Sequence, residues 1–278
     1  MAENTTIGTA GQLVAYLKQQ AVKHKTLYHY TNLAGALGIL KSGYVHLTSI
    51  QSKNDKTEIF HGQESERENV FAFSFAHGTK ENMSLWGLYS IPWTEGVRLD
   101  FKLTAAELLA ASELYCLPDN STGYKPISNS SAEVSLADVA YCAEDKNGVF
   151  SLRGIRDAAE HLDLTTDPKL IGYIKRDAWQ YENETRIRVH MDNPGQLGLL
   201  ALKLPDDAYA GIRITAAPWF KGNLEAALQQ ELGRGFEVYE SAFANLVDYR
   251  DHCYYCAKKP FEREQSKLPI TKHTISAL

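Results

Sequence analysis

Short segments in which apolar and polar residues alternate occur near both ends of the chain, and helix-like segments lie between them. No regular alternation of strand and helix runs through the 278 residues. This order predicts an α+β fold with mostly antiparallel sheets and argues against a doubly wound parallel sheet. A chain of this length buries about three quarters of its unfolded surface, so it needs no disulfide bonds to hold its core.

The alternating segments are the strands expected from the sequence. They cover 26–31, 44–49, 69–76, 96–102, 113–117, 184–190, 198–205, 211–217 and 236–240. Helices are expected at 9–24, 33–41, 83–90, 104–112 and 223–232, and two more helical stretches within 152–176. Thr9 and Asn32 are suited to cap the first two helices, and Gly43 is suited to end the second. We expect one domain over residues 1–257, with a loop insertion at about 118–133 and a flexible tail at 258–278.

The charge balance excludes a protein that holds nucleic acid by bulk charge, because 29 basic residues face 34 acidic ones and the net charge is -5. Residues 1–60 nevertheless hold six basic and three acidic residues. This local excess favours an anionic ligand near the N-terminal part. Four cysteines are too few for a disulfide framework, the N-terminus lacks a secretory signal, and no apolar run approaches the roughly 20 residues of a membrane span. We therefore expect a cytoplasmic protein with no membrane partner.

The common nucleotide-binding, metalloprotease and hydrolase motifs are absent from the sequence. Cys253 and Cys256 form one CxxC pair, which is weak evidence for zinc unless Cys116 or Cys142 completes the site. We expect no metal site, and the role of the Cys253 and Cys256 pair stays open.

A first candidate constellation lies at 27–31, directly before the helix that Asn32 caps. Side chains alternate along a strand, so Tyr28 and Tyr30 share one face while His29 and Thr31 share the other. Paired His29 and Thr31 side chains could bind a polar ligand. The alternative is a half-buried strand in which His29 bonds a backbone carbonyl.

A second constellation consists of Glu182, Glu184, Arg186 and Arg188, which share one face if the strand runs unbroken through them. Four charges on one strand face must contact water, pair with each other or line a cleft. In a cleft, a glutamate could bond a sugar hydroxyl and stabilise the positive charge that develops during N-glycosidic cleavage. The alternative is a solvated face whose ion pairs each contribute under about 1 kcal/mol.

Aromatic residues form a third constellation. A strand containing Ser74 between two phenylalanines precedes a short helix, on which Trp86 and Tyr89 are three residues apart and share a face. Such a pair is more often part of a core or a cleft wall than a ligand platform. A flat aromatic surface would, however, suit a nucleobase or a nicotinamide ring.

Taken in order, these segments resemble a bacterial family known as domain of unknown function 2971. The shared pattern is a Tyr-His-Tyr-Thr start, an Asn-Asp-Pro-x-Glu loop, a Met-Trp-x-x-Tyr helix and a Glu-x-Glu-x-Arg strand, over roughly residues 26 to 235. Two positions depart from it: Lys56 stands where proline is usual, and Thr185 stands where tryptophan is usual.

The same layout is similar to ADP-ribosyltransferases of the diphtheria-toxin and poly(ADP-ribose) polymerase type. The resemblance implies split, mostly antiparallel sheets with flanking helices, and NAD as substrate with no metal required. It implies catalytic roles for Glu184 and Glu182. It implies NAD-binding roles for His29, Tyr30, Thr31, Ser74, Trp86, Tyr89 and Arg186.

The function expected from this resemblance is NAD-dependent mono-ADP-ribosyl transfer to a macromolecule, either nucleic acid or protein. A toxin or antiphage-defence effector, with an antitoxin as partner, is the kind of protein expected. Two alternatives stay open: an NAD glycohydrolase that passes the ribose to water, and a non-catalytic ligand-binding or interaction domain on the same scaffold.

Overall fold

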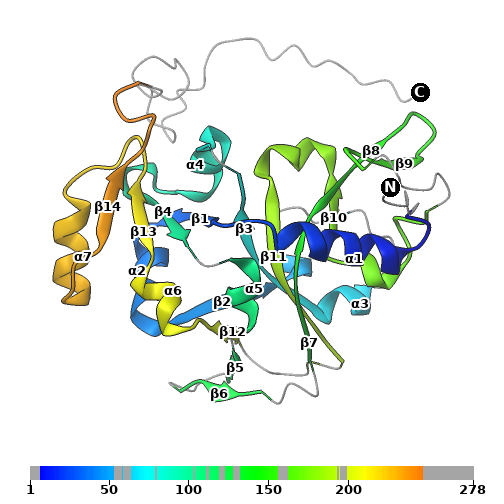
Figure 1. Ribbon diagram of the computed structural model, residues 1–278, viewed down its shortest axis with the longest axis horizontal. Helices are drawn as coiled ribbons and strands as arrows, with labels where there is room; N and C mark the ends of the chain where they lie inside the picture. Colours follow the sequence, from blue (N-terminus) through cyan, green and yellow to red (C-terminus); the bar gives the residue numbers. More distant parts are fainter. Residues whose placement is uncertain are drawn as a thin grey trace, which may run out of the picture.

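Figure 1 shows the computed structural model of the chain. One end of the fold carries α7 (Leu224–Leu232) and β14 (Glu237–Glu240), and the other carries α1 (Ala10–Ala21) and the hairpin of β8 (Ala140–Glu144) and β9 (Phe150–Leu152). The structure describes residues 7–52, 58, 64–78, 80–102, 104–110, 113–118, 123–127, 132–155, 162–192, 194 and 199–246. The predicted tail at 258–278, the Cys253 and Cys256 pair, Lys56 and half of the predicted insertion at 118–133 lie outside these residues.

Seven α-helices and four short 3-10 helices occur in the described part of the chain. The α-helices are α1 (Ala10–Ala21), α2 (Leu33–Ser42), α3 (Glu64–Glu68), α4 (Met83–Tyr89), α5 (Ala105–Ala110), α6 (Asp206–Ala210) and α7 (Leu224–Leu232). The 3-10 helices are η1 (Ile50–Ser52), η2 (Trp93–Glu95), η4 (Pro168–Leu170) and η5 (Asp177–Glu182).

The strands of the first half are β1 (Leu27–Asn32), β2 (Tyr44–Ser49), β3 (Val70–Ala76), β4 (Gly96–Phe101), β5 (Glu113–Leu117), β6 (Lys125–Pro126) and β7 (Ala132–Asp138). Those of the second half are β8 (Ala140–Glu144), β9 (Phe150–Leu152), β10 (Ile174–Arg176), β11 (Glu184–Met191), β12 (Leu199–Lys203), β13 (Arg213–Ala216) and β14 (Glu237–Glu240).

The predicted helix ends are confirmed where capping chemistry defined them. The Thr9 side chain accepts from the backbone N–H of Gln12, whose own side chain completes a capping box. Asn32 caps α2 by accepting from Gly35, and Gly43 ends α2 in the left-handed conformation with φ 77°. These local bonds satisfy backbone groups that a helix end would otherwise leave without partners.

Strand β3 organises the main sheet because three strands share its two edges. Along one edge it pairs with β11 from Phe71 opposite Val189 to Ala76 opposite Glu184. Along the other edge β1 pairs only at Ala76 and β2 only at Phe71 and Ala72. The sheet therefore divides there into one limb of β1, β4, β13 and β14 and another of β2, β12, β5 and β6.

The structure confirms a mixed α+β fold with mostly antiparallel sheets. Parallel pairing occurs between β10 and β8 and between β13 and β14, and the other strand pairs are antiparallel. The prediction of two helical stretches within 152–176 is wrong for the described residues, where the 3-10 helix η4 and the strand β10 occur instead. Residues 156–161 lie outside the described part.

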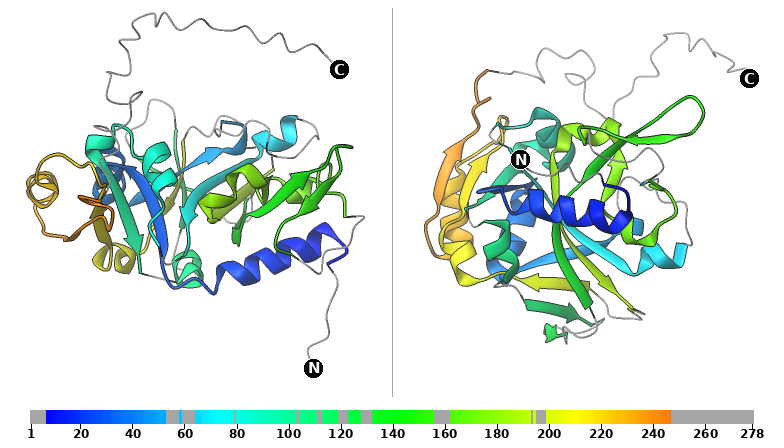
Figure 2. Two further views of the ribbon diagram at one scale, coloured as in Figure 1. Left: turned by 90° about the horizontal axis from the view of Figure 1, so that it is seen from above. Right: turned by 45° about the vertical axis from the view of Figure 1, so that its right-hand side comes forward.

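Helix α1 covers one side of the sheet beside β7 and β11, and the views of Figure 2 show it running along that side. Its buried Leu13 and Leu17 join a core cluster with Ala137, Tyr173 and Ile174. The opposite face of β11 contributes Ile187 and Val189 to the main core. No helix within the described residues has both the length and the apolar character that a membrane crossing requires.

Candidate functional site

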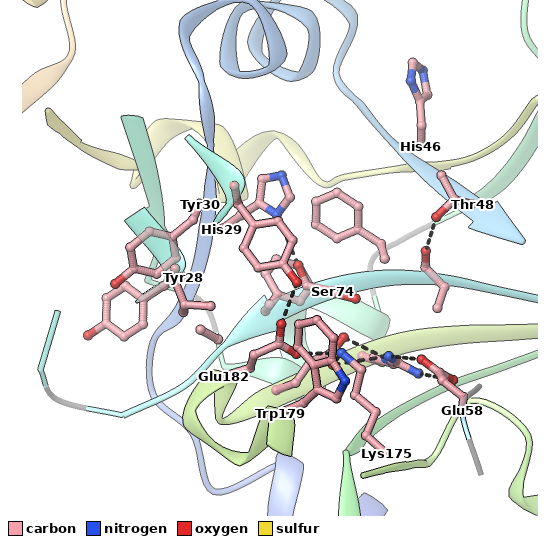
Figure 3. A pocket seen from close by; sticks show the side chains of 18 residues that line it. Tyr28, His29, Tyr30, His46, Thr48, Glu58, Ser74, Lys175, Trp179 and Glu182 are labelled. Carbon is pink, nitrogen blue, oxygen red and sulfur yellow. Dashed lines mark hydrogen bonds and ion pairs between the residues drawn. The ribbon is translucent and has the colours of Figure 1, made fainter. Parts of the chain in front are cut away.

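A cavity of about 350 Å³ opens where β1 and β2 part from each other along the edge of β3. Its volume lies in the range of small-molecule binding sites. Figure 3 shows His29 and Ser74 on one side of this cavity, with Glu182, Lys175 and Glu58 along another. The division of the sheet thus creates the space in which the candidate residues meet.

His29 is held at the unpaired stretch of the β3 edge. Its Nδ1 lies 3.1 Å from the Ser74 carbonyl oxygen. A carbonyl oxygen can only accept, so Nδ1 carries the proton and, in the neutral ring, the lone pair belongs to Nε2. The ring also lies against Phe73, with 4.4 Å between ring centres. These contacts fix the orientation of His29 in the cavity wall.

Glu184 begins β11 and is only 4% exposed. Its carboxylate accepts from Arg186 Nε at 2.7 Å and Nη2 at 3.2 Å, and it lies 2.8 Å from Lys175 Nζ. Burial alone would raise the pKa of Glu184, but Arg186 and Lys175 outweigh it and hold that pKa well below its usual range. Glu184 is therefore an ionised carboxylate throughout the physiological pH range.

Glu182 precedes β11 and reaches the same place from the end of a 3-10 helix. It ends η5, and Asn183 then turns the chain in the left-handed conformation with φ 44° before β11 begins. The strand begins at Glu184, as predicted, so the condition of an unbroken strand through Glu182 is not met. Asparagine is among the few non-glycine residues that adopt this conformation readily. The turn directs Glu182 and Glu184 toward the same Lys175 ammonium.

The remaining contacts of Glu182 come from Tyr89 and Lys175. The Tyr89 hydroxyl donates to Glu182 Oε1 at 2.5 Å, and Lys175 Nζ lies 2.5 Å from Oε2. Burial and the Glu182 carboxylate raise the pKa of Tyr89. Tyr89 therefore stays protonated and acts as a hydrogen-bond donor to Glu182.

Arg186 connects the glutamates to a further acidic residue. It is 1% exposed, donates through Nη2 to Glu58 at 2.6 Å and through Nη1 to the Gly172 carbonyl at 3.0 Å. The connected charges are three carboxylates, from Glu58, Glu182 and Glu184, and two cations, from Arg186 and Lys175. The alternative of a solvated strand face is thus wrong, because these charges are buried and paired.

The structure brings together most, but not all, of the residues singled out in the sequence. The predicted residues that line the cavity are His29, Tyr30, Ser74, Tyr89, Glu182, Glu184 and Arg186. Thr31 and Trp86 are not among the lining residues. Trp86 is fully buried, donates from Nε1 to Glu81 at 3.0 Å and lies edge-on to Tyr30. It is a core residue behind the cavity wall.

Several lining residues have no counterpart among the sequence candidates. They are His46, Thr48, Glu58, Lys175 and Trp179. Glu58 occupies the glutamate position of the Asn-Asp-Pro-x-Glu pattern, so the motif itself contained a usable indication. Lys175 lies on β10, in a stretch expected to be helical, and its ammonium lies 5.3 Å from the centre of the Trp179 ring.

His24, His77 and Asp138 form a group of described residues with the composition of a metal site. The two imidazole rings, however, stack with 3.9 Å between centres and an interplanar angle of 11°. Parallel rings direct their in-plane lone pairs side by side instead of toward one ion. Asp138 already lies 2.9 Å from His24 Nε2 and accepts from the Thr185 hydroxyl at 2.7 Å. Hydrogen bonding accounts for this group.

The chain matches no protein-family model, and comparisons with curated proteins and with solved structures find no significant match. Inference about function therefore starts from the chemistry of the cavity.

Proposed function

We propose that the chain binds NAD in this cavity and transfers its ADP-ribosyl group to an acceptor. The observation that carries the proposal is the meeting of His29, Tyr89 and Glu184 in one cavity, although they lie on β1, α4 and β11. A strand histidine, an aromatic residue and a late-strand glutamate are the set that the resemblance to ADP-ribosyltransferases implies. Their convergence supports the same class of reaction for this chain.

The charge of the cavity wall suits the cationic nicotinamide ring as it is bound in NAD. The three carboxylates and two cations leave one net negative charge beside the cavity. The nicotinamide ring of NAD carries a positive charge, and the aromatic surfaces of Tyr89 and Trp179 line the same space. An aromatic wall with excess negative charge favours a flat cationic ring.

In the proposed reaction, the bond between ribose C1′ and the nicotinamide nitrogen breaks, and both its electrons leave with nicotinamide. The ribose then resembles an oxocarbenium ion. The ionised Glu184 carboxylate would accept a hydrogen bond from the ribose 2′-hydroxyl and stabilise the positive charge. Arg186 and Lys175 hold this carboxylate in place before the reaction, so little reorganisation is needed.

The acceptor atom attacks C1′ and forms the new glycosidic bond, and its proton must pass to a base. Glu184 is a poor base because its pKa is so low. Glu182 has one cationic partner among the described residues, Lys175, and also faces the cavity. We assign the proton to Glu182 and charge stabilisation to Glu184.

The test incubates purified protein with adenine-labelled NAD and separate pools of RNA, DNA and cell protein. We expect label transfer to one pool and its loss in Glu184→Gln. The matched control is Asp100→Asn, which neutralises another buried, arginine-bonded carboxylate outside the cavity. Activities are compared per folded molecule, so that loss of stability is not mistaken for loss of catalysis.

Two outcomes would change the proposal. Release of nicotinamide without label transfer to any pool would replace the transferase by an NAD glycohydrolase. If the wild-type protein neither binds nor consumes NAD, the proposal is wrong and the cavity serves another ligand or none.

A further inference from the structure

A second cavity, of about 330 Å³, lies beside the same charged face of β11, farther along the strand from Glu184. Arg188 and His190 of β11 line it, together with Lys169 of η4 and Val14 of α1. Gly11 and Val14 of α1 line the cavity, so it lies beside that helix, which Figure 1 shows passing across β7 and β11. None of these four residues lines the first cavity.

Arg188 is the feature of this cavity that calls for a ligand. The residue is 4% exposed, its Nε donates to the Ile171 carbonyl at 2.7 Å, and its guanidinium lies 4.8 Å from the centre of the Tyr173 ring. Its two terminal nitrogens have no hydrogen-bond partner among the described residues. They are not fully enclosed by protein either, so they face the accessible space of the cavity.

A guanidinium placed in this way is matched by an oxyanion. Its two terminal nitrogens present parallel N–H donors, whose spacing fits two oxygens of one phosphate or carboxylate. Burial strengthens such a charge-assisted bond, whereas leaving buried donors without a partner is unfavourable.

The neighbouring charges add to the attraction for an anion. Lys169 is exposed, and its ammonium has no partner among the described residues. His190 lies opposite Glu133 on the paired strand β7. Glu133 is the acidic residue of the lining, and Lys18 lies 3.3 Å from its carboxylate. The lining therefore retains two permanent positive charges, from Arg188 and Lys169, on a chain whose net charge is -5.

We propose that this cavity is a binding site for the phosphate group of a small phosphorylated molecule. Arg188 would bind the phosphate through both terminal nitrogens, and Lys169 would neutralise its second charge. Val14 and Pro168 form an apolar wall for the organic part of the ligand. The site uses residues outside the NAD cavity, so it does not depend on the function proposed for that cavity.

The test is calorimetric titration of the full chain with adenosine 5′-monophosphate, with inorganic phosphate and with adenosine. We expect saturable binding of the monophosphate and none of adenosine. Equal affinity for inorganic phosphate would identify the free anion as the ligand, and weaker binding of phosphate would identify a phosphorylated organic molecule.

Variants locate the binding on the second cavity. Lys169→Gln changes an exposed side chain and is expected to weaken binding three- to tenfold, and Arg188→Lys, which keeps the charge but loses the paired donors, at least tenfold. Lys203→Gln, an exposed lysine on β12, is the control and should bind as the wild type does. The proposal is overturned if the wild type binds neither phosphate nor the monophosphate, or if Lys169→Gln binds as tightly as Lys203→Gln.

Discussion

Two strands of the protein each carry a buried arginine bonded through two nitrogens to a carboxylate two positions away. On β4, Arg98 Nε and Nη2 donate to Asp100 at 2.6 and 2.7 Å. On β11, Arg186 Nε and Nη2 donate to Glu184 at 2.7 and 3.2 Å. The local geometry is closely similar, yet of these two pairs only the β11 pair lines the first cavity.

The surroundings of the two pairs differ in charge balance. The β4 pair has one cation and one carboxylate, and the rings of Tyr28 and Tyr30 lie 4.6 and 5.7 Å from the Arg98 guanidinium carbon. The β11 pair continues to Glu58 on one side and to Lys175 and Glu182 on the other. The β4 pair is electrically neutral by itself. The network around the β11 pair carries one excess negative charge beside the cavity, which a cationic ligand could neutralise.

The pKa shifts of the two carboxylates reflect the same difference. Burial raises the pKa of Asp100, and the single guanidinium of Arg98 offsets this only in part. Burial acts on Glu184 as well, but two cations lower its pKa well below the usual value. One arginine therefore neutralises a buried carboxylate, while an arginine and a lysine keep it firmly ionised.

The largest expected effect separates the two pairs by activity. Glu184→Gln should reduce ADP-ribosyl transfer by about 10²- to 10⁴-fold, because it removes the charge that stabilises the transition state. Asp100→Asn should change the rate per folded molecule by less than about threefold, since Asp100 does not line the cavity. Initial rates with labelled NAD measure both variants. Equal losses of transfer rate in the two variants would show that the different charge balance of the two pairs does not matter for activity.

The next effect separates the pairs by stability. Arg98→Met leaves one buried carboxylate without its cation and should lower the free energy of unfolding by about 3–5 kcal/mol. Arg186→Met removes the cation shared by Glu58 and Glu184 and should be at least as destabilising. Urea unfolding followed by circular dichroism gives both values. A smaller loss in Arg186→Met than in Arg98→Met would contradict the view that Arg186 holds the network together.

A half-buried carboxylate, that of Asp138, extends the comparison from arginine to histidine partners. Asp138 contacts His24 and lies 3.8 Å from His77 Nδ1. Burial lowers the pKa of His77 from 6.5 to about 4, with Asp138 opposing and His24 adding to the shift. The folded state thus disfavours protonated His77. The contribution of neutral His77 to the free energy of unfolding is therefore fully present above pH 6.5 and is lost as the pH falls toward 4.

The expected loss from this histidine is about 2–3 kcal/mol of unfolding free energy between pH 6.5 and 4.5. In the unfolded chain Glu184 has its ordinary pKa of 4.5, so its own contribution begins to be lost only at the lower end of this window. Urea unfolding at several pH values measures the slope, and His77→Gln should flatten it. A slope that is unchanged in His77→Gln would assign the pH dependence to other groups.

The smallest effect concerns the turn that joins Glu182 to Glu184. Asn183→Val places a β-branched side chain at φ 44° and should lower stability by about 1–3 kcal/mol, whereas Asn183→Gly should be close to neutral. Thermal unfolding measures both variants. If the two variants unfold at the same temperature, the left-handed turn is not what positions these glutamates.

Alternation of apolar and polar residues and capping residues at helix ends predicted the elements whose structure depends on their own sequence. The strands β1 and β3 follow from alternation, and α2 follows from the Asn32 cap and the Gly43 end. His29 and Glu184 were found because each lies on a strand of clear alternation next to a distinctive motif. Trp86 and Tyr89 share a helix face, but only the fold decides that Tyr89 faces the cavity and Trp86 the core.

Other parts depend on contacts between distant segments and have no local pattern. Lys175 becomes a site residue only because β10 pairs with β8, which lies more than thirty positions earlier. The strands β7 to β10 contain short, mixed segments that alternation does not distinguish. The charge pattern of β11 continues back to Glu182, but the left-handed turn at Asn183 separates Glu182 from the strand. Backbone conformation there overrides the side-chain period.

Two consecutive peptide carbonyls, those of Ile171 and Gly172, bind the arginines of both cavities. Ile171 accepts from Arg188 and Gly172 from Arg186. Gly172 has φ 82°, a conformation that favours glycine, and it is bonded directly to Ile171, so a movement of one carbonyl is passed to its neighbour. A ligand that displaces Arg188 would therefore shift the acceptor of Arg186. Binding in the two cavities would then be thermodynamically linked, and each ligand would change the affinity of the other by the same factor.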